Sequence, residues 1–153
     1  MDVELAHHPF DPAERQAAFA RAAPDEGAVV SFTGFARATG GAGNVVALVL
    51  EHYRGVTLAS MEEIVRDAHV RFAVTRCHVV HRHGRVAPGE AVVFVAAAAR
   101  HRRAAFEAAD YIMDRLKTEA VFWKREEGDF GIAWIEPTDD DAADVRRWSL
   151  IED

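Results

Sequence analysis

The longest apolar run of the chain is AVVFVAAAA, residues 91–99, which lies between Glu90 and Arg100. Nine residues are far fewer than the roughly 20 that a membrane-spanning helix needs, so we expect a strand and no contact with a membrane. Residues 75–83 predict a second strand, and a Pro-Gly pair between the two strands marks a turn. A helical pattern with one apolar face follows at residues 102–120. Hairpins followed by helices are therefore the units of the predicted fold.

The same units extend to both ends of the chain. Further strands are predicted around Val3 and Leu5 and at residues 27–35, 45–53, 121–125 and 132–135. One helix is predicted after the Asp11-Pro12 cap, and another begins with Thr57 as its cap. Because adjacent hairpins replace strict alternation of strand and helix, we expect an α+β fold. Its sheet is mixed or antiparallel, with helices packed on one side.

The charge of the chain is concentrated at its end. The net charge of the 153 residues is −7, and residues 136–153 alone contribute −5. We therefore predict a single domain over residues 1–136 and an acidic tail over 137–153. The tail carries the apolar residues Trp148, Leu150 and Ile151. We expect it to be either docked on the domain or disordered. A body this close to neutral argues against nucleic acid as a partner. The basic residues between 100 and 125 still allow a local pocket for a small anion.

The start of the chain and its cysteine content favour a cytoplasmic protein. Asp2 and Glu4 occupy the place where a secretory signal is basic. The lone Cys77 cannot form an internal disulfide.

The two lysines are the most informative candidates for chemistry. Sixteen of the 18 basic residues are arginine, and only Lys117 and Lys124 are lysine. A lysine amine can lose its proton and act as a base or nucleophile, whereas an arginine side chain cannot. A helix-to-strand turn between the two positions could bring both ammonium groups to one site, where like charges lower a lysine pKa. Two solvated surface lysines remain the alternative.

Three further cations are candidates for anion binding. Arg37 follows a predicted strand, where it could hold a phosphate through two hydrogen bonds. His101 and Arg102 open the predicted third helix, whose free N–H groups also attract anions. Solvated surface positions are the alternative for all three.

Metal and cofactor sites are not predicted. His81 and His83 face one side of their strand and His78 the other, so these histidines cannot converge on a zinc ion. Cys77 lies in the same strand and is expected to be a packed thiol. The glycine loop at residues 40–43 lacks the features of a nucleotide-binding loop.

Five blocks of the sequence, in order, resemble the large, catalytic subunit of molybdopterin synthase over nearly the whole chain. They are GAVVSFTG at residues 27–34 with Arg37, LEHY at 50–53, HRHG at 81–84 with Gly89-Glu90, HRRAAF at 101–106, and MDRLKT at 113–118 with FWKRE at 122–126.

The resemblance implies an α/β-hammerhead domain and a sulfurtransferase. In this family the large subunit forms a homodimer, and each protomer binds one small ubiquitin-like sulfur carrier, which gives a heterotetramer. The carrier's C-terminal Gly-Gly thiocarboxylate donates sulfur to cyclic pyranopterin monophosphate, which forms the dithiolene of molybdopterin. The resemblance places the catalytic lysines at Lys117 and Lys124. It places substrate-binding residues at Arg37 and, from the neighbouring protomer, at His101 and Arg102.

Two positions depart from the family pattern. Val121 replaces a usual proline, and this change is expected to loosen the turn before Lys124. Thr138 replaces an arginine found in many members, so one anion contact is expected to be missing or supplied by Arg146 or Arg147. Two functions other than catalysis stay open: a dimeric binding module that holds a phosphorylated metabolite, and an inactive scaffold for the carrier.

Overall fold

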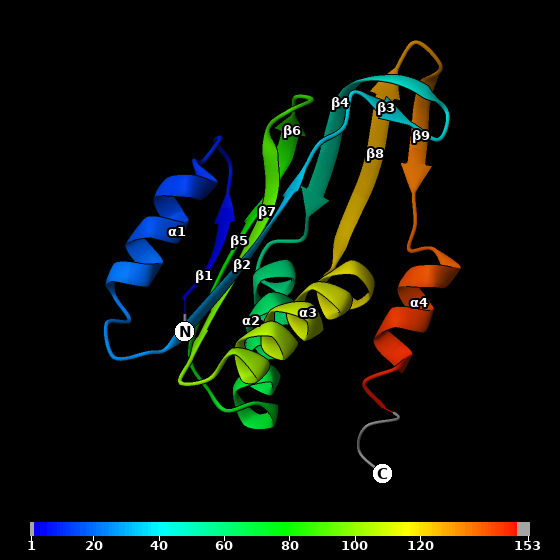
Figure 1. Ribbon diagram of the computed structural model, residues 1–153. Helices are drawn as coiled ribbons and strands as arrows, with labels where there is room; N and C mark the ends of the chain where they lie inside the picture. Colours follow the sequence, from blue (N-terminus) through cyan, green and yellow to red (C-terminus); the bar gives the residue numbers. More distant parts are fainter. Residues whose placement is uncertain (1, 150–153) are drawn as a thin grey trace.

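The structure is a computed structural model that describes residues 2–149 and contains two sheets and four helices (Figure 1). The helices are α1 (Pro12–Arg21), α2 (Val56–Arg71), α3 (Arg102–Glu119) and α4 (Asp139–Arg146). The strands are β1 (Asp2–Ala6), β2 (Ala28–Phe35), β3 (Thr39–Gly40), β4 (Gly43–His52), β5 (Val74–Arg82), β6 (Gly84–Val86), β7 (Ala91–Ala99), β8 (Phe122–Gly128) and β9 (Gly131–Ile135). The predicted α+β class is confirmed. No helix within residues 2–149 is long and apolar enough to span a bilayer.

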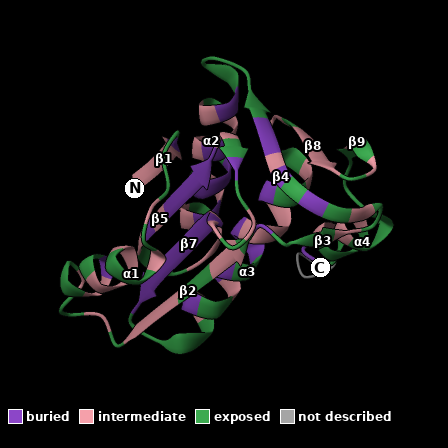
Figure 2. Cartoon of the chain, turned by 90° about the horizontal axis from the view of Figure 1, so that it is seen from above, coloured by how far each residue is buried: buried purple, intermediate pink, exposed green. Residues whose placement is uncertain are grey.

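The first sheet is covered on both faces, which corrects the expectation of helices on one side. Its strand order is β1-β5-β7-β2, with β1 parallel to β5 and the other pairs antiparallel. Helix α1 packs on one face through Phe19, whereas α2 and α3 cover the other (Figure 1). The cause is β7, which is apolar at every position and therefore requires cover on both sides. Figure 2 shows β5 and β7 as the most buried strands.

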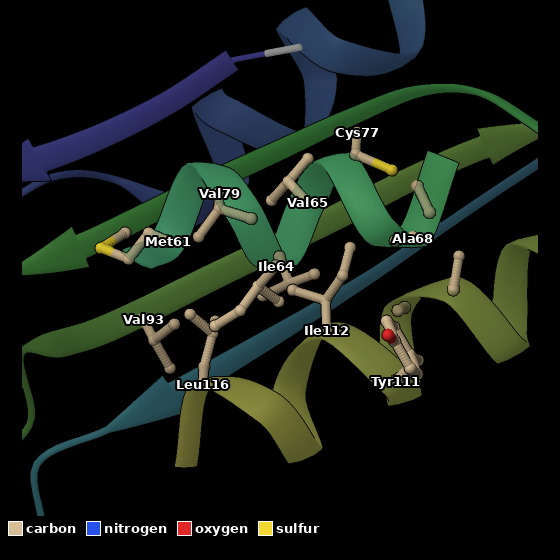
Figure 3. Close-up of a cluster of buried hydrophobic side chains, with 14 of the residues drawn as sticks. Met61, Ile64, Val65, Ala68, Cys77, Val79, Val93, Tyr111, Ile112 and Leu116 are labelled. Atoms are coloured by element: carbon tan, nitrogen blue, oxygen red, sulfur yellow. The ribbon is translucent and has the colours of Figure 1, made fainter. Parts of the chain in front are cut away.

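The larger core lies between this sheet and helices α2 and α3. Ile64 of α2 and Ile112 and Leu116 of α3 point toward one another and toward Val79 and Val93 of the sheet (Figure 3). These side chains are between 0 and 7% exposed. Burial of a side chain of this size contributes about 1.5–3 kcal/mol, so the C-terminal half of α3 is held firmly against the sheet.

The turn from α3 into β8 is fixed by α2. The Val121 N–H donates to Ser60 Oγ at 3.3 Å, and the Val121 carbonyl accepts a hydrogen bond from Thr57 Oγ1. A proline at position 121 could not make the first bond, so the valine adds an anchor to this turn. Thr57 is not the helix cap that the sequence predicts. The cap is Gly55, and Thr57 Oγ1 instead accepts the Tyr53 N–H at 2.8 Å.

The second sheet joins distant parts of the chain. Its order is β3-β4-β8-β9, and β6 also pairs with β4. Through this pairing, Leu50 of β4 lies opposite Lys124 of β8, which lies opposite Ile135 of β9. The hairpin predicted around Gly128 and Asp129 is thus confirmed.

The acidic segment after residue 136 is docked as far as the structure describes it. Thr138 and Asp141 form a capping box that starts α4, and α4 packs against α3. Trp148 is 6% exposed, and its Nε1–H donates to Asp114 Oδ2 at 2.7 Å. Leu150 and Ile151 lie outside the described residues.

We expect Trp148→Phe to lower the free energy of unfolding by about 1–3 kcal/mol, because it removes the hydrogen bond from the indole N–H to the Asp114 carboxylate and leaves that carboxylate to Arg147 alone. The aromatic contacts with Phe72 and Tyr111 are largely kept. Chemical denaturation measures the change. Ser149→Ala, next to it and exposed, is the control and should change stability by less than about 0.5 kcal/mol. Equal stability of Trp148→Phe and the parent protein would show that the docking is not energetically significant.

Candidate active site

A pocket of about 510 Å³ opens between the two sheets and the end of α3. Arg37, Lys117 and Lys124 all line it. We call it the cation pocket. Apolar side chains from β4, β7, β8 and α3 form much of its wall: Leu50, Val93, Leu116 and Phe122. Three of the five predicted site residues are therefore brought together.

Lys124 is the partly buried lysine of the pocket. Residues alternate across strand β8, so that Phe122 and Lys124 face the pocket while Trp123 between them is 53% exposed. Burial lowers the pKa of the Lys124 amine, and the nearby Lys117 ammonium lowers it further. The Asp141 carboxylate of α4 acts in the opposite direction. The amine thus releases its proton more readily than an exposed lysine does.

Lys117 reaches the same pocket from the last turn of α3. Its side chain is exposed, and it is the basic residue of that turn. A cation at the carboxyl end of a helix is stabilised by the helix dipole. The short turn to β8, anchored through Val121, sets its position relative to Lys124. The expectation that one turn brings both lysines to one site is confirmed.

Arg37 also lines the pocket. It lies in the segment after β2, beside Ala36, whose N–H donates to the Glu90 carbonyl at 3.0 Å. The guanidinium is exposed, and Arg37 has no ion pair with a described residue. It is therefore free to bind an anion that enters the pocket.

His101 and Arg102 do not line the cation pocket. His101 caps the start of α3 without a side-chain hydrogen bond, and both residues are exposed. Arg102 precedes Lys117 by 15 residues, which corresponds to about 22 Å along a helix. Within one chain, these two residues cannot bind a small ligand held by Lys117.

The pocket is also lined by four titratable residues that were not predicted as site residues: His81, Glu126, Glu136 and Asp141. The alternation of β5 contained a signal for His81, because it shares a face with the buried Cys77 and Val79. Glu126 follows Lys124 by two residues and faces the same way. Its carboxylate packs against Gly40, where a β-carbon would collide with it. No sequence signal places Asp141 here, since its position depends on how α4 docks.

The histidines and the cysteine behave as their strand positions predict. His78 packs against Phe19 and Phe94 on the α1 face, whereas His81 stacks on Phe122 in the pocket. Within residues 2–149, no group of three or more His, Cys, Asp or Glu side chains is arranged to hold a metal ion. Burial raises the pKa of the Cys77 thiol to about 11, so the thiol stays protonated and unreactive at neutral pH.

Thr138 does not supply an anion contact. Its hydroxyl accepts the Asp141 N–H at 3.1 Å as the cap of α4. Arg147 is engaged with Asp110 and Asp114 at 2.6 and 2.8 Å, away from the pocket lining. Neither Arg146 nor Arg147 lines the pocket, so of the two expected alternatives the structure shows the missing contact.

Comparison with known proteins identifies close relatives. Residues 5–119 match the family model described as MoaE protein. The chain is 52% identical to the molybdopterin synthase catalytic subunit of Caulobacter vibrioides over 148 residues, or 97% of each chain. It is 45% identical to that of Escherichia coli K12 over 124 residues, or 81% of this chain and 83% of the relative.

Solved structures agree with these relatives. The MoaE protein from Burkholderia ambifaria matches with a TM-score of 0.81 at 37% identity, covering 97% of both chains. A chain in the complex of subunits 1 and 2 of molybdopterin-converting factor from Helicobacter pylori matches with a TM-score of 0.73 at 19% identity, covering 86% of this chain and 88% of that one. At that identity the second match shows likeness of fold alone.

Proposed function

This chain belongs to the MoaE family, and from that membership we propose that it is the catalytic subunit of a molybdopterin synthase. It transfers sulfur from a thiocarboxylated small carrier subunit to cyclic pyranopterin monophosphate. The observation that carries the proposal is that the only two lysines of the chain line one pocket with Arg37. The relatives are named catalytic subunits, which implies a second subunit.

The proposed chemistry divides the pocket into two roles. The guanidinium of Arg37 binds the cyclic phosphate by charge-assisted hydrogen bonds. The lysines act at the carrier's C-terminal thiocarboxylate, where an ammonium stabilises developing negative charge and an amine accepts or donates a proton. The lowered pKa of Lys124 suits the amine role, because the neutral form becomes accessible closer to neutral pH.

The activity is tested by mixing the protein with thiocarboxylated carrier and cyclic pyranopterin monophosphate and measuring molybdopterin. We expect turnover with both partners and none when either is left out. Binding of the pyranopterin without turnover would favour a binding module for a phosphorylated metabolite. Binding of the carrier alone would favour a scaffold.

We also propose a homodimer in which His101 and Arg102 complete the cation pocket of the partner copy. This arrangement would explain why they lie about 22 Å from Lys117 along their own helix. A chain with Lys117→Ala and a chain with Arg102→Ala should each be inactive. After dissociation and mixing in equal amounts, activity should return to about a quarter of the parent value, because half the dimers then contain one intact pocket. Light scattering checks the dimer. If the two variants exchange subunits and the activity still does not return, the shared pocket is excluded.

Arg37→Ala should weaken pyranopterin binding by roughly tenfold to a hundredfold, since a charge-assisted contact is worth about 1.5–3 kcal/mol. Calorimetry measures the change. Arg66→Ala, an exposed position on α2, is the control and should bind like the parent protein. Unchanged affinity in Arg37→Ala would remove Arg37 from the phosphate site.

Two further assignments are proposals of the same kind. We propose a cytoplasmic location, supported by the unpaired and buried Cys77. We also propose that residues 1–136 form the catalytic domain and residues 137–153 a C-terminal segment that packs on α3 through α4.

A further inference from the structure

The floor of the cation pocket contains a rigid imidazole. His81 lines the pocket but is only 4% exposed. Its ring stacks on Phe122, with the ring centroids 4.3 Å apart and the planes inclined by 27°. Stacking and burial together fix the direction in which the two ring nitrogens point.

The hydrogen bond of one nitrogen determines the state of the other. Nδ1 of His81 lies 2.8 Å from the carbonyl oxygen of Arg82. A carbonyl oxygen can only accept a hydrogen bond, so Nδ1 carries the hydrogen and Nε2 carries a lone pair. His81 is therefore an acceptor toward the pocket.

This imidazole is neutral at physiological pH. Burial lowers the pKa of His81 to about 3, and the Lys124 and Lys117 ammonium groups add to the effect. Lys124 faces it from β8 and Lys117 from α3. The acids that line the same pocket are Glu126 of β8, Glu136 after β9 and Asp141 of α4. The tautomer with a free Nε2 is therefore the one present at neutral pH.

Nε2 has no partner in the protein. Within residues 2–149, the one hydrogen bond of the His81 ring is that of Nδ1, and Nε2 is not among the unpaired atoms sealed from the surface. It therefore borders the pocket. An acceptor that faces the pocket without a protein partner is available to a ligand that brings a donor.

We propose that His81 is a recognition residue, whose Nε2 accepts a hydrogen bond from an N–H or O–H group on the uncharged part of the ligand. The cations above it bind the anionic part of the same ligand. This inference rests on the proposed function, in which the ligand is a pyranopterin phosphate whose nitrogen heterocycle carries N–H groups. Arg37 and the lysines select for charge, and His81 selects for the ring.

Nitrogen NMR of the histidine-labelled protein tests the contact directly. The Nε2 resonance of His81, assigned by its loss in His81→Gln, should shift when cyclic pyranopterin monophosphate binds. Inorganic phosphate, which has no heterocycle, should leave it unchanged. An Nε2 resonance that stays in place when the pyranopterin binds would overturn the proposal.

Calorimetry provides a second measurement. His81→Phe keeps the ring and its stacking but removes the acceptor, and we expect about tenfold weaker pyranopterin binding. Its affinity for inorganic phosphate should match that of the parent protein. His81→Gln keeps an acceptor at the end of its side chain and should recover most of the affinity. Thermal melts show whether each variant folds. If His81→Phe does not fold, the NMR test on the parent protein still decides the proposal.

The two proposals fail in different ways. If the parent protein does not bind the pyranopterin, the proposed function is wrong. If it binds and forms molybdopterin while His81→Phe binds equally well, only the role of His81 is wrong.

Discussion

Lys117→Arg is expected to lose at least about 100-fold in the rate of molybdopterin formation, nearly as much as Lys117→Ala. A positioned acid or base contributes roughly 10²–10⁴-fold, and arginine cannot fill either role because its guanidinium does not release a proton. The change keeps the positive charge at the end of α3. It therefore separates the need for an amine from the need for a cation.

The measurement is single-turnover formation of molybdopterin with excess thiocarboxylated carrier. Both variants should fold, because the exposed Lys117 side chain contributes little to the core. Arg66→Lys on α2 is the control, since it exchanges the same two residue types at an exposed position outside the pocket. Near-parental turnover by Lys117→Arg would mean that the site needs only a positive charge there.

The position of the lysines could be predicted from the sequence because it depends on local structure. Lys117 and Lys124 are separated by one turn, so knowing that a helix ends and a strand begins between them is enough to bring them together. Arg37 was placed by similar reasoning, as the residue that follows a strand. Each prediction used only a few neighbouring residues of the chain.

The features that the sequence did not predict depend on contacts between distant elements. The cover on the second face of the first sheet was missed although the apolar run of β7 indicates it, but which helix supplies that cover depends on the packing of α1. Asp141 reaches the pocket only because Trp148 and Arg147 dock α4 on α3. The role of His81 depends on a bond to the next backbone carbonyl. Sequence reasoning considered that histidine only as a metal ligand.

The structure also changes the prediction for the second lysine. From the sequence, Lys124→Arg is expected to be the milder substitution, with Lys124 orienting the anion by charge. Lys124 is however the more buried lysine, and its Nζ lies over the Phe122 ring at 5.9 Å from the centroid. A guanidinium is larger than an ammonium and cannot become neutral. Both properties conflict with this position.

We therefore expect Lys124→Arg to lose at least about 100-fold in single-turnover rate as well. Lys124→Met keeps the apolar stem beside Phe122 and should fold like the parent protein. If Lys124→Met is inactive and Lys124→Arg retains most of the activity, charge alone is required and the sequence-based expectation is the right one.

The pH dependence of the single-turnover rate is an independent test of the role of Lys124. If its neutral amine acts, the rate rises with pH and levels off above the Lys124 pKa, which lies below that of an exposed lysine because of burial and the neighbouring Lys117. The Asp141 carboxylate raises this pKa, so Asp141→Asn, which keeps an acceptor for the Thr138 N–H, should move the rise to lower pH. Glu119→Gln, an exposed acid at the end of α3 outside the pocket, should leave it in place. If the pH–rate profile of Asp141→Asn is the same as that of the parent protein, the pH dependence of the rate does not come from the Lys124 amine.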